Sequence, residues 1–265
     1  MIVSRTLLAT AGLALALTAG AASFDDLLAG FGSSGAAQVK AYTQPLGDAA
    51  TALATGGAFH GARSKGIAGF DLGIKVLLLP VSSGDAPAGS ILASSQTDVS
   101  TLGLPMLTAS KGLVKGLQVS GRYMGLELSK DVGKLSYMGA SLRFELNELF
   151  HVPLLMPRIG LQADWNKLEV GESLSTTATS LDLIVSKSFV IIEPYAGLSL
   201  AKGTTDISYT STALPGQQVG VSLDSKPLRL AAGVSVTPFP LLRINAEVAK
   251  GDFTTATLGV LINLF

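Results

Sequence analysis

Charged residues recur at every second position within several apolar runs of this chain, and their spacing is the first indication of chemistry. Residues two positions apart in a β-strand lie on the same face, so one face of each run carries the charges. Charges enclosed in a protein interior need partners of opposite sign. Six cations and six carboxylates share this parity: Asp71, Lys75, Arg122, Arg143, Glu145, Arg158, Asp164, Asp182, Glu193, Arg229, Arg243 and Glu247.

The sequence is compatible with two arrangements of these twelve charges. Either they form a network of ion pairs that fills and rigidifies the interior of a barrel, or they line a polar pore with charge-selective walls. Glycines on the same face leave room for water or for helices. They are Gly73, Gly160, Gly197, Gly233 and Gly259.

Residue types suited to catalysis are sparse. The two histidines, His60 and His151, lie in no recognisable nucleophile motif, and the chain contains neither a G-x-S-x-G elbow nor an H-E-x-x-H zinc motif. The absence of cysteine excludes disulfides and thiolate metal sites. Asp164 and Asp182 can pair across adjacent strands, but so can many of the other charges. We therefore predict no enzymatic activity, no cofactor and no metal site.

Alternation of polar and apolar residues predicts the strands that position these charges. Nine strands are clear, and bacterial single-chain barrels use an even number, so the irregular run 98–104 is taken as the tenth. Residues 203–225 are expected to form a long loop, or a hairpin extending above the sheet, at the outer end. The nine clear strands cover residues 67–79, 117–128, 134–146, 157–169, 175–187, 190–202, 228–236, 242–248 and 256–264.

Composition supports an all-β membrane protein over a soluble one. Charged residues make up 14% of the 265 residues, against roughly 25% in ordinary soluble domains. Mean hydropathy is +0.46, yet beyond residue 22 no apolar run approaches the roughly 18 residues of a membrane helix. The face opposite the apolar one carries Gly, Ser, Asn and Gln with spaced charges, whereas a soluble barrel shows water many Lys and Glu. A formal net charge of zero argues against nucleic-acid binding.

The N-terminal residues predict export. Residues 1–22 combine Arg5, an apolar stretch at 7–17 and an A-x-A site at 19–21, as in a cleaved secretory signal peptide; an N-terminal membrane anchor is the alternative. Residues 23–62 are expected to form a helical plug or cap, with Ala-rich helices at 35–41 and 48–54 separated by Pro45. A flexible N-terminus is the alternative. Residues 63–265 are assigned to the barrel.

The chain resembles Gram-negative outer-membrane β-barrels as a class. Its final strand, with Gly259, Ile262, Leu264 and Phe265, resembles their C-terminal assembly signal, which implies recognition by the barrel-assembly machinery. The opening region, with Tyr42, Pro45, Leu46 and residues 48–54, looks loosely like the N-terminal plug of fatty-acid-transporter-like barrels. That resemblance implies a role in moving hydrophobic molecules into or across the outer membrane.

These observations predict an antiparallel up-and-down transmembrane β-barrel of about ten strands (range 8–12) with a short helical N-terminal segment. The expected function is a narrow channel or carrier for small molecules, hydrophobic ones included, in the bacterial outer membrane. Outer-membrane lipid and a small hydrophobic ligand are the expected partners. One alternative is a structural or surface-exposed barrel with a lumen filled by ion pairs and no transport. The other is a soluble periplasmic ligand-binding barrel.

Overall fold

The computed structural model describes residues 35–80, 101–114, 116–129, 133–150, 156–210 and 218–264. The residues assigned to a signal peptide, together with His151 and Phe265, lie outside these ranges. The helices are α2 (Gly35–Thr55) and the short α4 (Leu146–Phe150). The strands are β1 (Phe70–Pro80), β2 (Thr101–Val114), β3 (Leu117–Ser129), β4 (Gly133–Glu145), β5 (Arg158–Val170), β6 (Leu174–Ser186), β7 (Ile192–Thr210), β8 (Gln218–Ser225), β9 (Leu228–Phe239), β10 (Leu242–Lys250) and β11 (Thr254–Leu264).

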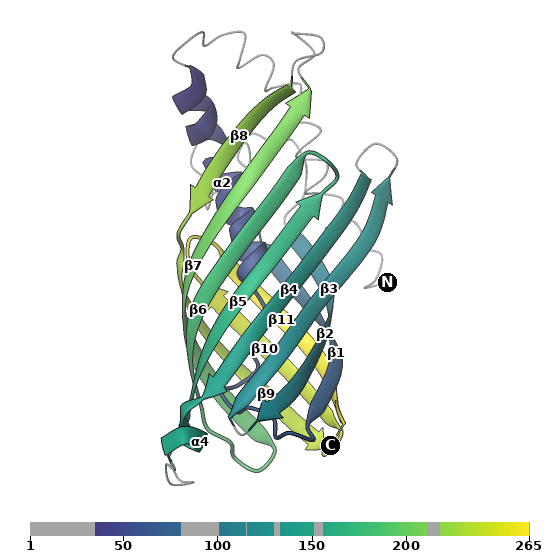
Figure 1. Ribbon diagram of the computed structural model, residues 1–265, viewed down its shortest axis with the longest axis vertical. Coiled ribbons are helices and arrows are strands. Elements are labelled where there is room, and N and C mark those ends of the chain that lie inside the picture. The colour runs from purple at the N-terminus through teal and green to yellow at the C-terminus, as the bar shows by residue number, and fades with distance from the viewer. Residues whose placement is uncertain are drawn as a thin grey trace.

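Ten of the strands close into an antiparallel barrel (Figure 1). Neighbours in sequence pair from β1 to β7, β9 follows β7, and β11 returns to β1. The remaining strand, β8, pairs with residues 203–210 of β7, while β9 pairs with residues 192–200 of the same strand. The predicted ten-stranded antiparallel barrel with a short N-terminal helix is therefore confirmed.

Three elements differ from the sequence-based expectation. β2 is a regular strand of 14 residues, where only a short irregular run at 98–104 was expected. Residues 203–225 mostly extend β7 and form β8, so the hairpin alternative describes them and the loop does not. Pro45 lies inside the continuous helix α2 and does not break it, because burial of the helix compensates for the lost backbone hydrogen bond.

The outer face of the barrel is apolar, as the alternation predicts. Ile74, Leu181 and Leu258 are each 57% exposed, and no aqueous face of a soluble barrel would expose so many large apolar side chains. Other outward residues include Leu72, Met138, Leu142, Leu200, Leu230, Val248 and Ile262.

The interior divides into two zones along the barrel. The half that contains the turns between β6 and β7 and between β9 and β10, which we call the lower half, buries polar and charged side chains. The upper half buries an apolar cluster that includes residues of α2. Its wall residues include Leu77, Leu79, Leu102, Leu104, Met106, Met124, Leu135, Leu168, Val170, Leu174, Ile207 and Leu223. The apolar lining of the upper half was not predicted from the sequence.

The wall is also less complete in the upper half. Pairing between β2 and β3 ends at Leu107 and Tyr123, so residues 101–106 and 124–129 of the two strands are not paired with each other. The strands β3 to β8 form a taller half-wall, and α2 lies along its inner face in contact with β5, β6, β7 and β8 (Figure 1). In the described part of the chain, no helix has the length and hydropathy needed to cross a bilayer.

Candidate functional site

The lumen is occupied by α2 and the residues that follow it. We call residues 56–69, between α2 and β1, the lumen segment. Every residue from 49 to 62 is buried, so the chain enters the barrel at one end and fills it down to the lower half. This filled lumen is the candidate functional site, since any molecule that crosses the barrel must displace or pass this chain.

Three glycines on the inner wall make room for this chain. A Cβ atom built on Gly203 of β7 would lie 2.6 Å from Cγ2 of Thr51, and one on Gly197 would lie 2.8 Å from the Phe59 ring. A Cβ on Gly160 of β5 would lie 3.1 Å from a backbone oxygen of Ala62. At Gly197 and Gly160, two of the wall glycines noted in the sequence, the space is thus filled by the N-terminal chain.

Buried donors of the wall satisfy the C-terminal end of α2. The Tyr137 hydroxyl donates to the carbonyl of Ala54 (3.1 Å), and Nη1 of Arg122 donates to the carbonyl of Gly56 (3.0 Å). Nζ of Lys75 donates to the carbonyls of Gly57 (2.8 Å) and Phe59 (3.1 Å). The last carbonyls of a helix lack partners within the helix and carry partial negative charge, so cations are favoured there.

Further wall residues hold the last residue of α2 and the rest of the lumen segment. Nη1 of Arg229 donates to Oγ1 of Thr55 (2.9 Å), and the Ser235 hydroxyl donates to the carbonyl of His60 (2.9 Å). The backbone N–H of Ser64 donates to the Glu145 carboxylate (2.7 Å). The segment is therefore fixed to several different strands of the wall.

All twelve predicted lumen charges lie on the inner side of the wall. Ten are buried, and Arg158 and Arg243 are partly exposed. The ion pairs among the twelve that the structure shows are Arg122–Asp164 at 3.0 Å, Arg243–Glu193 at 3.6 Å and a close contact of Arg158 with Glu145. Most of the cations contact the lumen segment or α2 as well as, or in place of, a carboxylate. They hold a plug in place, a role that neither of the two arrangements considered for them included.

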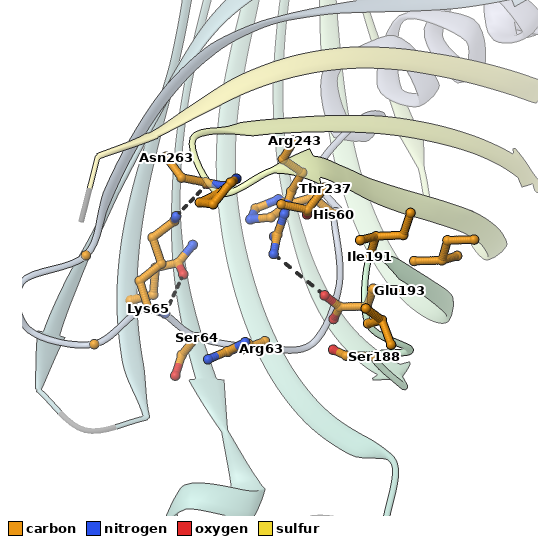
Figure 2. A pocket seen from close by; sticks show the side chains of 16 residues that line it. His60, Arg63, Ser64, Lys65, Ser188, Ile191, Glu193, Thr237, Arg243 and Asn263 are labelled. Carbon is orange, nitrogen blue, oxygen red and sulfur yellow. Dashed lines mark hydrogen bonds and ion pairs between the residues drawn. The ribbon is translucent and has the colours of Figure 1, made fainter.

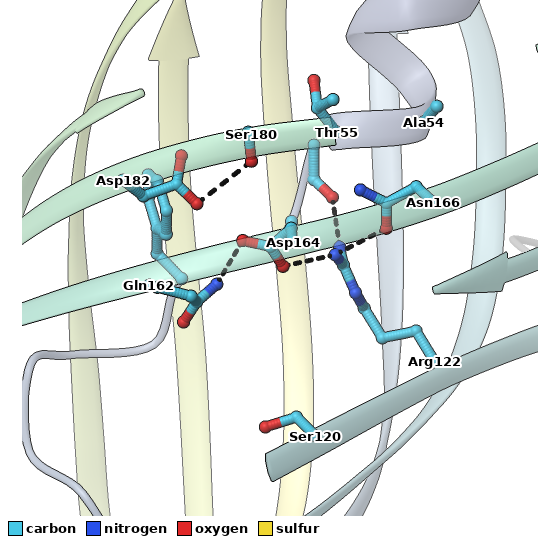
Figure 3. Close-up of polar contacts among 12 residues, drawn as sticks. Ala54, Thr55, Ser120, Arg122, Gln162, Asp164, Asn166, Ser180 and Asp182 are labelled. Atoms are coloured by element: carbon cyan, nitrogen blue, oxygen red, sulfur yellow. Dashed lines mark hydrogen bonds and ion pairs between the residues drawn. The ribbon is translucent and has the colours of Figure 1, made fainter. Parts of the chain in front are cut away.

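Asp164 and Asp182 come near each other but hold different partners. In the register of β5 and β6, Gln162 pairs with Asp182 and Asp164 pairs with Ser180, so the two carboxylates are diagonal neighbours. Asp164 accepts hydrogen bonds from Arg122 and Gln162, and Asp182 accepts one from Ser180 (Figure 3). Within the described residues, no cluster of three His, Asp or Glu side chains is arranged to hold a metal ion.

Several residues of the site were not selected from the sequence. Tyr137 and Asn166 share the parity of the lumen charges, and that signal was sufficient to find them. His60 and Lys65 lie off the strands, and no local pattern marks them. Lys65 forms an ion pair with Asp71 at 3.0 Å and donates to Oδ1 of Asn263 at 3.0 Å.

His60 makes the stability of the plugged barrel depend on pH. Its pKa is lowered well below the ordinary 6.5, first by burial and then by the positive charges of Arg143, Lys75, Arg243 and Lys65. The folded barrel keeps His60 neutral, whereas the unfolded chain protonates it below about pH 6.5. The free energy of unfolding therefore falls as the pH drops below 6.5, by up to about 1.4 kcal/mol per pH unit from this group, until the folded pKa is reached.

Urea unfolding in lipid vesicles, followed by fluorescence of the single tryptophan Trp165, measures this dependence between pH 8 and pH 5. The His60→Gln variant is expected to lose this part of the pH dependence while keeping the part due to other groups. Equal pH slopes in the wild-type chain and the variant would show that His60 does not titrate on unfolding.

Comparison with known proteins identifies the family to which the chain belongs. A family profile described as a family of unknown function, DUF6588, matches residues 83–264, more than half of the chain. The chain belongs to the DUF6588 family. A search of curated protein sequences finds no significant match.

Solved structures similar to this DUF6588 chain are outer-membrane barrels. The N-terminal β-barrel domain of Pseudomonas aeruginosa OprF is 14% identical, with 76% of this chain and 100% of that chain covered and a TM-score of 0.33. The KdgM porin in complex with disordered oligogalacturonate is 10% identical (74% and 99% covered, TM-score 0.35), and Neisserial surface protein A is 11% identical (74% and 96% covered, TM-score 0.32). Likeness at this level carries no argument about function, and the fold rests on the strand pairing. The likeness to fatty-acid transporters is not supported by these structures and stays a hypothesis.

Proposed function

We propose that this DUF6588 chain is a bacterial outer-membrane barrel that carries small molecules, hydrophobic ones included, with α2 and the lumen segment as its gate. The apolar outer face supports the membrane location, because lipid-facing strands of a barrel must be apolar and charge there is costly. It argues against the soluble periplasmic barrel, which would expose this face to water.

The proposal rests on one observation. The upper lumen has an apolar lining, and beside this lining two neighbouring strands of the wall are not paired. Leu104 and Met106 of β2 and Met124 and Leu126 of β3 belong to or pack against the apolar cluster, and the two strands are not paired there. A barrel whose interior only needed filling has no need for unpaired strand edges, which are normally avoided. An apolar interior next to unpaired strand edges, which can separate without breaking a backbone ladder, suits a molecule that passes between the lumen and the lipid or the outer surface.

The attachment of α2 suits a gate. In the upper half the described polar contacts of the helix with the wall involve Gln44 and Asp48, which contact the backbone of Asp224 (2.9 Å) and the hydroxyl of Ser225. Leu46, Ala49 and Leu53 of the helix add apolar packing, which can slide without leaving polar groups unpaired. The upper part of the helix can therefore shift at a lower cost than its hydrogen-bonded C-terminal end and the lumen segment.

A disulfide that locks α2 to the wall tests the gate directly. The chain has no cysteine, so Thr51→Cys with Gly203→Cys introduces a single pair; a Cβ on Gly203 would lie 3.0 Å from Cβ of Thr51, near the 3.5–4.5 Å of natural disulfides. Uptake of the hydrophobic fluorophore N-phenyl-1-naphthylamine by cells producing the barrel is the measurement. Oxidation is expected to reduce the uptake to the level of cells without the barrel, and reduction is expected to restore it.

The Thr51→Cys and Gly203→Cys single variants, oxidised and reduced in the same way, are the controls and should be insensitive to the treatment. Uptake that is above background and unchanged by the lock would contradict gating by α2.

A filled barrel without transport is the second candidate, and the complete burial of residues 49–62 favours it. In that case the wild-type barrel gives no fluorophore uptake above the background of cells without it, and the lock changes nothing. The same experiment thus separates the two functions.

A further inference from the structure

A cavity of about 370 Å³ opens at the lower end of the barrel, away from the apolar upper lumen (Figure 2). We call it the mouth pocket. Its lining comes from the lumen segment, from the start of β7 and the residues before it, and from the region where β9 turns into β10. A pocket of this size lies within the range of small-molecule sites. Its lining residues are separate from those of the apolar cluster and from the donors that hold the end of α2.

The charge of the mouth pocket is predominantly positive. Arg63, Lys65 and Arg243 line it, and Lys65 is paired with the buried Asp71 at 3.0 Å. Glu193 is the carboxylate among the lining residues. Glu193 is engaged by the Ser186 hydroxyl at 2.7 Å and by Arg243 at 3.6 Å. Arg63 is exposed and has no ion pair or hydrogen bond to any described residue. A cation at this position and without a partner is available to a bound anion.

Two lining residues of the pocket carry a buried donor without a partner among the described residues. Nε of Arg243 and Nδ1 of His60 are both buried without a hydrogen-bond partner among the described residues. Nε2 of His60 lies 3.2 Å from Nη1 of Arg143, which can only donate, so the proton of the neutral ring is on Nδ1. His60 is 4% exposed and lines the pocket. An unpaired buried donor costs free energy, which a bound acceptor would recover.

One side of the pocket is apolar. Val190, Ile191 and Ile192 line it next to Pro240, and Val190 has a positive φ of 46°. A β-branched residue rarely adopts this conformation, and such strain collects at functional sites. The pocket therefore offers cationic donors on one side and an aliphatic surface on the other.

We infer that the mouth pocket binds a small organic anion with a short aliphatic tail, its anionic group held by Arg63, Arg243 and His60. The tail lies against Ile191, whose side chain is about half exposed. This site does not depend on transport through the upper lumen, so it can hold even if the gate proposal fails.

Binding of hexanoate to the full-length barrel in lipid nanodiscs tests the site, with saturation-transfer NMR to detect contact and competition to estimate affinity. Hexanoate is expected to bind, and hexanol, which lacks the charge, is expected to bind at least about tenfold more weakly, since hydrogen bonds to charged groups are worth more than neutral ones. The variants Arg63→Gln and Arg243→Gln are each expected to weaken hexanoate binding about tenfold or more.

The exposed Lys226, outside the pocket, provides the matched control: Lys226→Gln removes one positive charge and is expected to bind hexanoate like the wild type. Arg63→Gln keeps the test valid if Arg243→Gln fails to fold, because Arg63 makes no described contact that folding would lose. Equal binding of hexanoate and hexanol, or undiminished binding by the Arg63→Gln variant, would overturn the inference.

Discussion

Replacement of Arg122 by methionine is expected to lower the free energy of unfolding by about 3–5 kcal/mol, because removing one partner of a buried ion pair leaves the other charge uncompensated. Arg122 is 4% exposed and lies 3.0 Å from Asp164. It also donates to Oδ1 of Asn166 at 2.9 Å and to the carbonyl of Gly56 at 3.0 Å. The substitution therefore leaves the charge of Asp164 uncompensated and removes one donor from the Asn166 amide oxygen and from the Gly56 carbonyl.

The double variant Arg122→Met with Asp164→Asn separates the charge from the rest of this effect. Asparagine keeps the shape and an acceptor for Gln162 but carries no charge, so the double variant is expected to recover part of the stability. Lys167→Met is the matched surface control. Lys167 and Glu169 form an ion pair at 2.6 Å with both side chains about 40% exposed, and exposed pairs contribute at most about 1 kcal/mol.

Urea titrations of the three variants and the wild type in lipid vesicles, read by Trp165 fluorescence, give the comparison. A loss for Arg122→Met as small as that for Lys167→Met would show that the lower lumen is wet enough to solvate Asp164. That outcome would favour an open water-filled path over a plug.

Most of the wall could be predicted from the sequence because each strand has one face in contact with an apolar surrounding and the other in contact with polar groups. A shift of one residue in the pairing register would exchange the inward and outward faces of a strand. Alternation therefore constrains both the register and the two ends of each strand. Residues 117–128 were expected as a strand and β3 covers Leu117–Ser129. The same alternation placed the twelve charges on the inner face of the wall.

The upper half of the barrel could not be predicted in this way. On the upper parts of β1 and β2 the wall is apolar on both faces, because lipid is expected outside and the apolar cluster lies inside, so alternation disappears. On β5, by contrast, Leu168 and Val170 are buried inside while the side chains of Lys167 and Glu169 are about 40% exposed. β2 is the clearest case, with Leu102, Leu104 and Met106 buried inward and Pro105 between them. At the top of β1, residues 76–79 are all apolar for the same reason. A run without alternation was interpreted as an irregular strand when it was a strand between two apolar surroundings.

The contacts of the plug were equally hidden from the sequence. Thr51 and Gly203 meet across 152 residues of chain, and only the closed barrel brings them together. The mouth pocket has the same origin, since His60 and Arg63 come from one connecting segment and Arg243 from a distant strand. Sequence patterns report the surroundings of a residue along its own element, and they carry little information about partners from remote elements.

Replacement of Gly203 by leucine is expected to push α2 away from the wall and to expose the helix to water. β7 is fixed at this point by pairing with β6 and β8, so the wall cannot yield, and the added side chain occupies the space of Thr51. Overpacking of this kind costs about 1–3 kcal/mol, which raises the population of the displaced helix by roughly 5- to 150-fold.

A single cysteine at position 50 reports the displacement, because Ala50 is fully buried and the chain has no other cysteine. Labelling of Ala50→Cys by a water-soluble maleimide is expected to be slow in the wild-type background and faster by roughly 5- to 150-fold with Gly203→Leu. Gly121→Leu is the matched control, since Gly121 is exposed on β3 and a Cβ there meets no atom within 4 Å. Equal labelling rates in the Gly203→Leu and Gly121→Leu backgrounds would show that α2 tolerates the extra volume in place, and the helix would then be a fixed part of the barrel with no capacity to act as a gate.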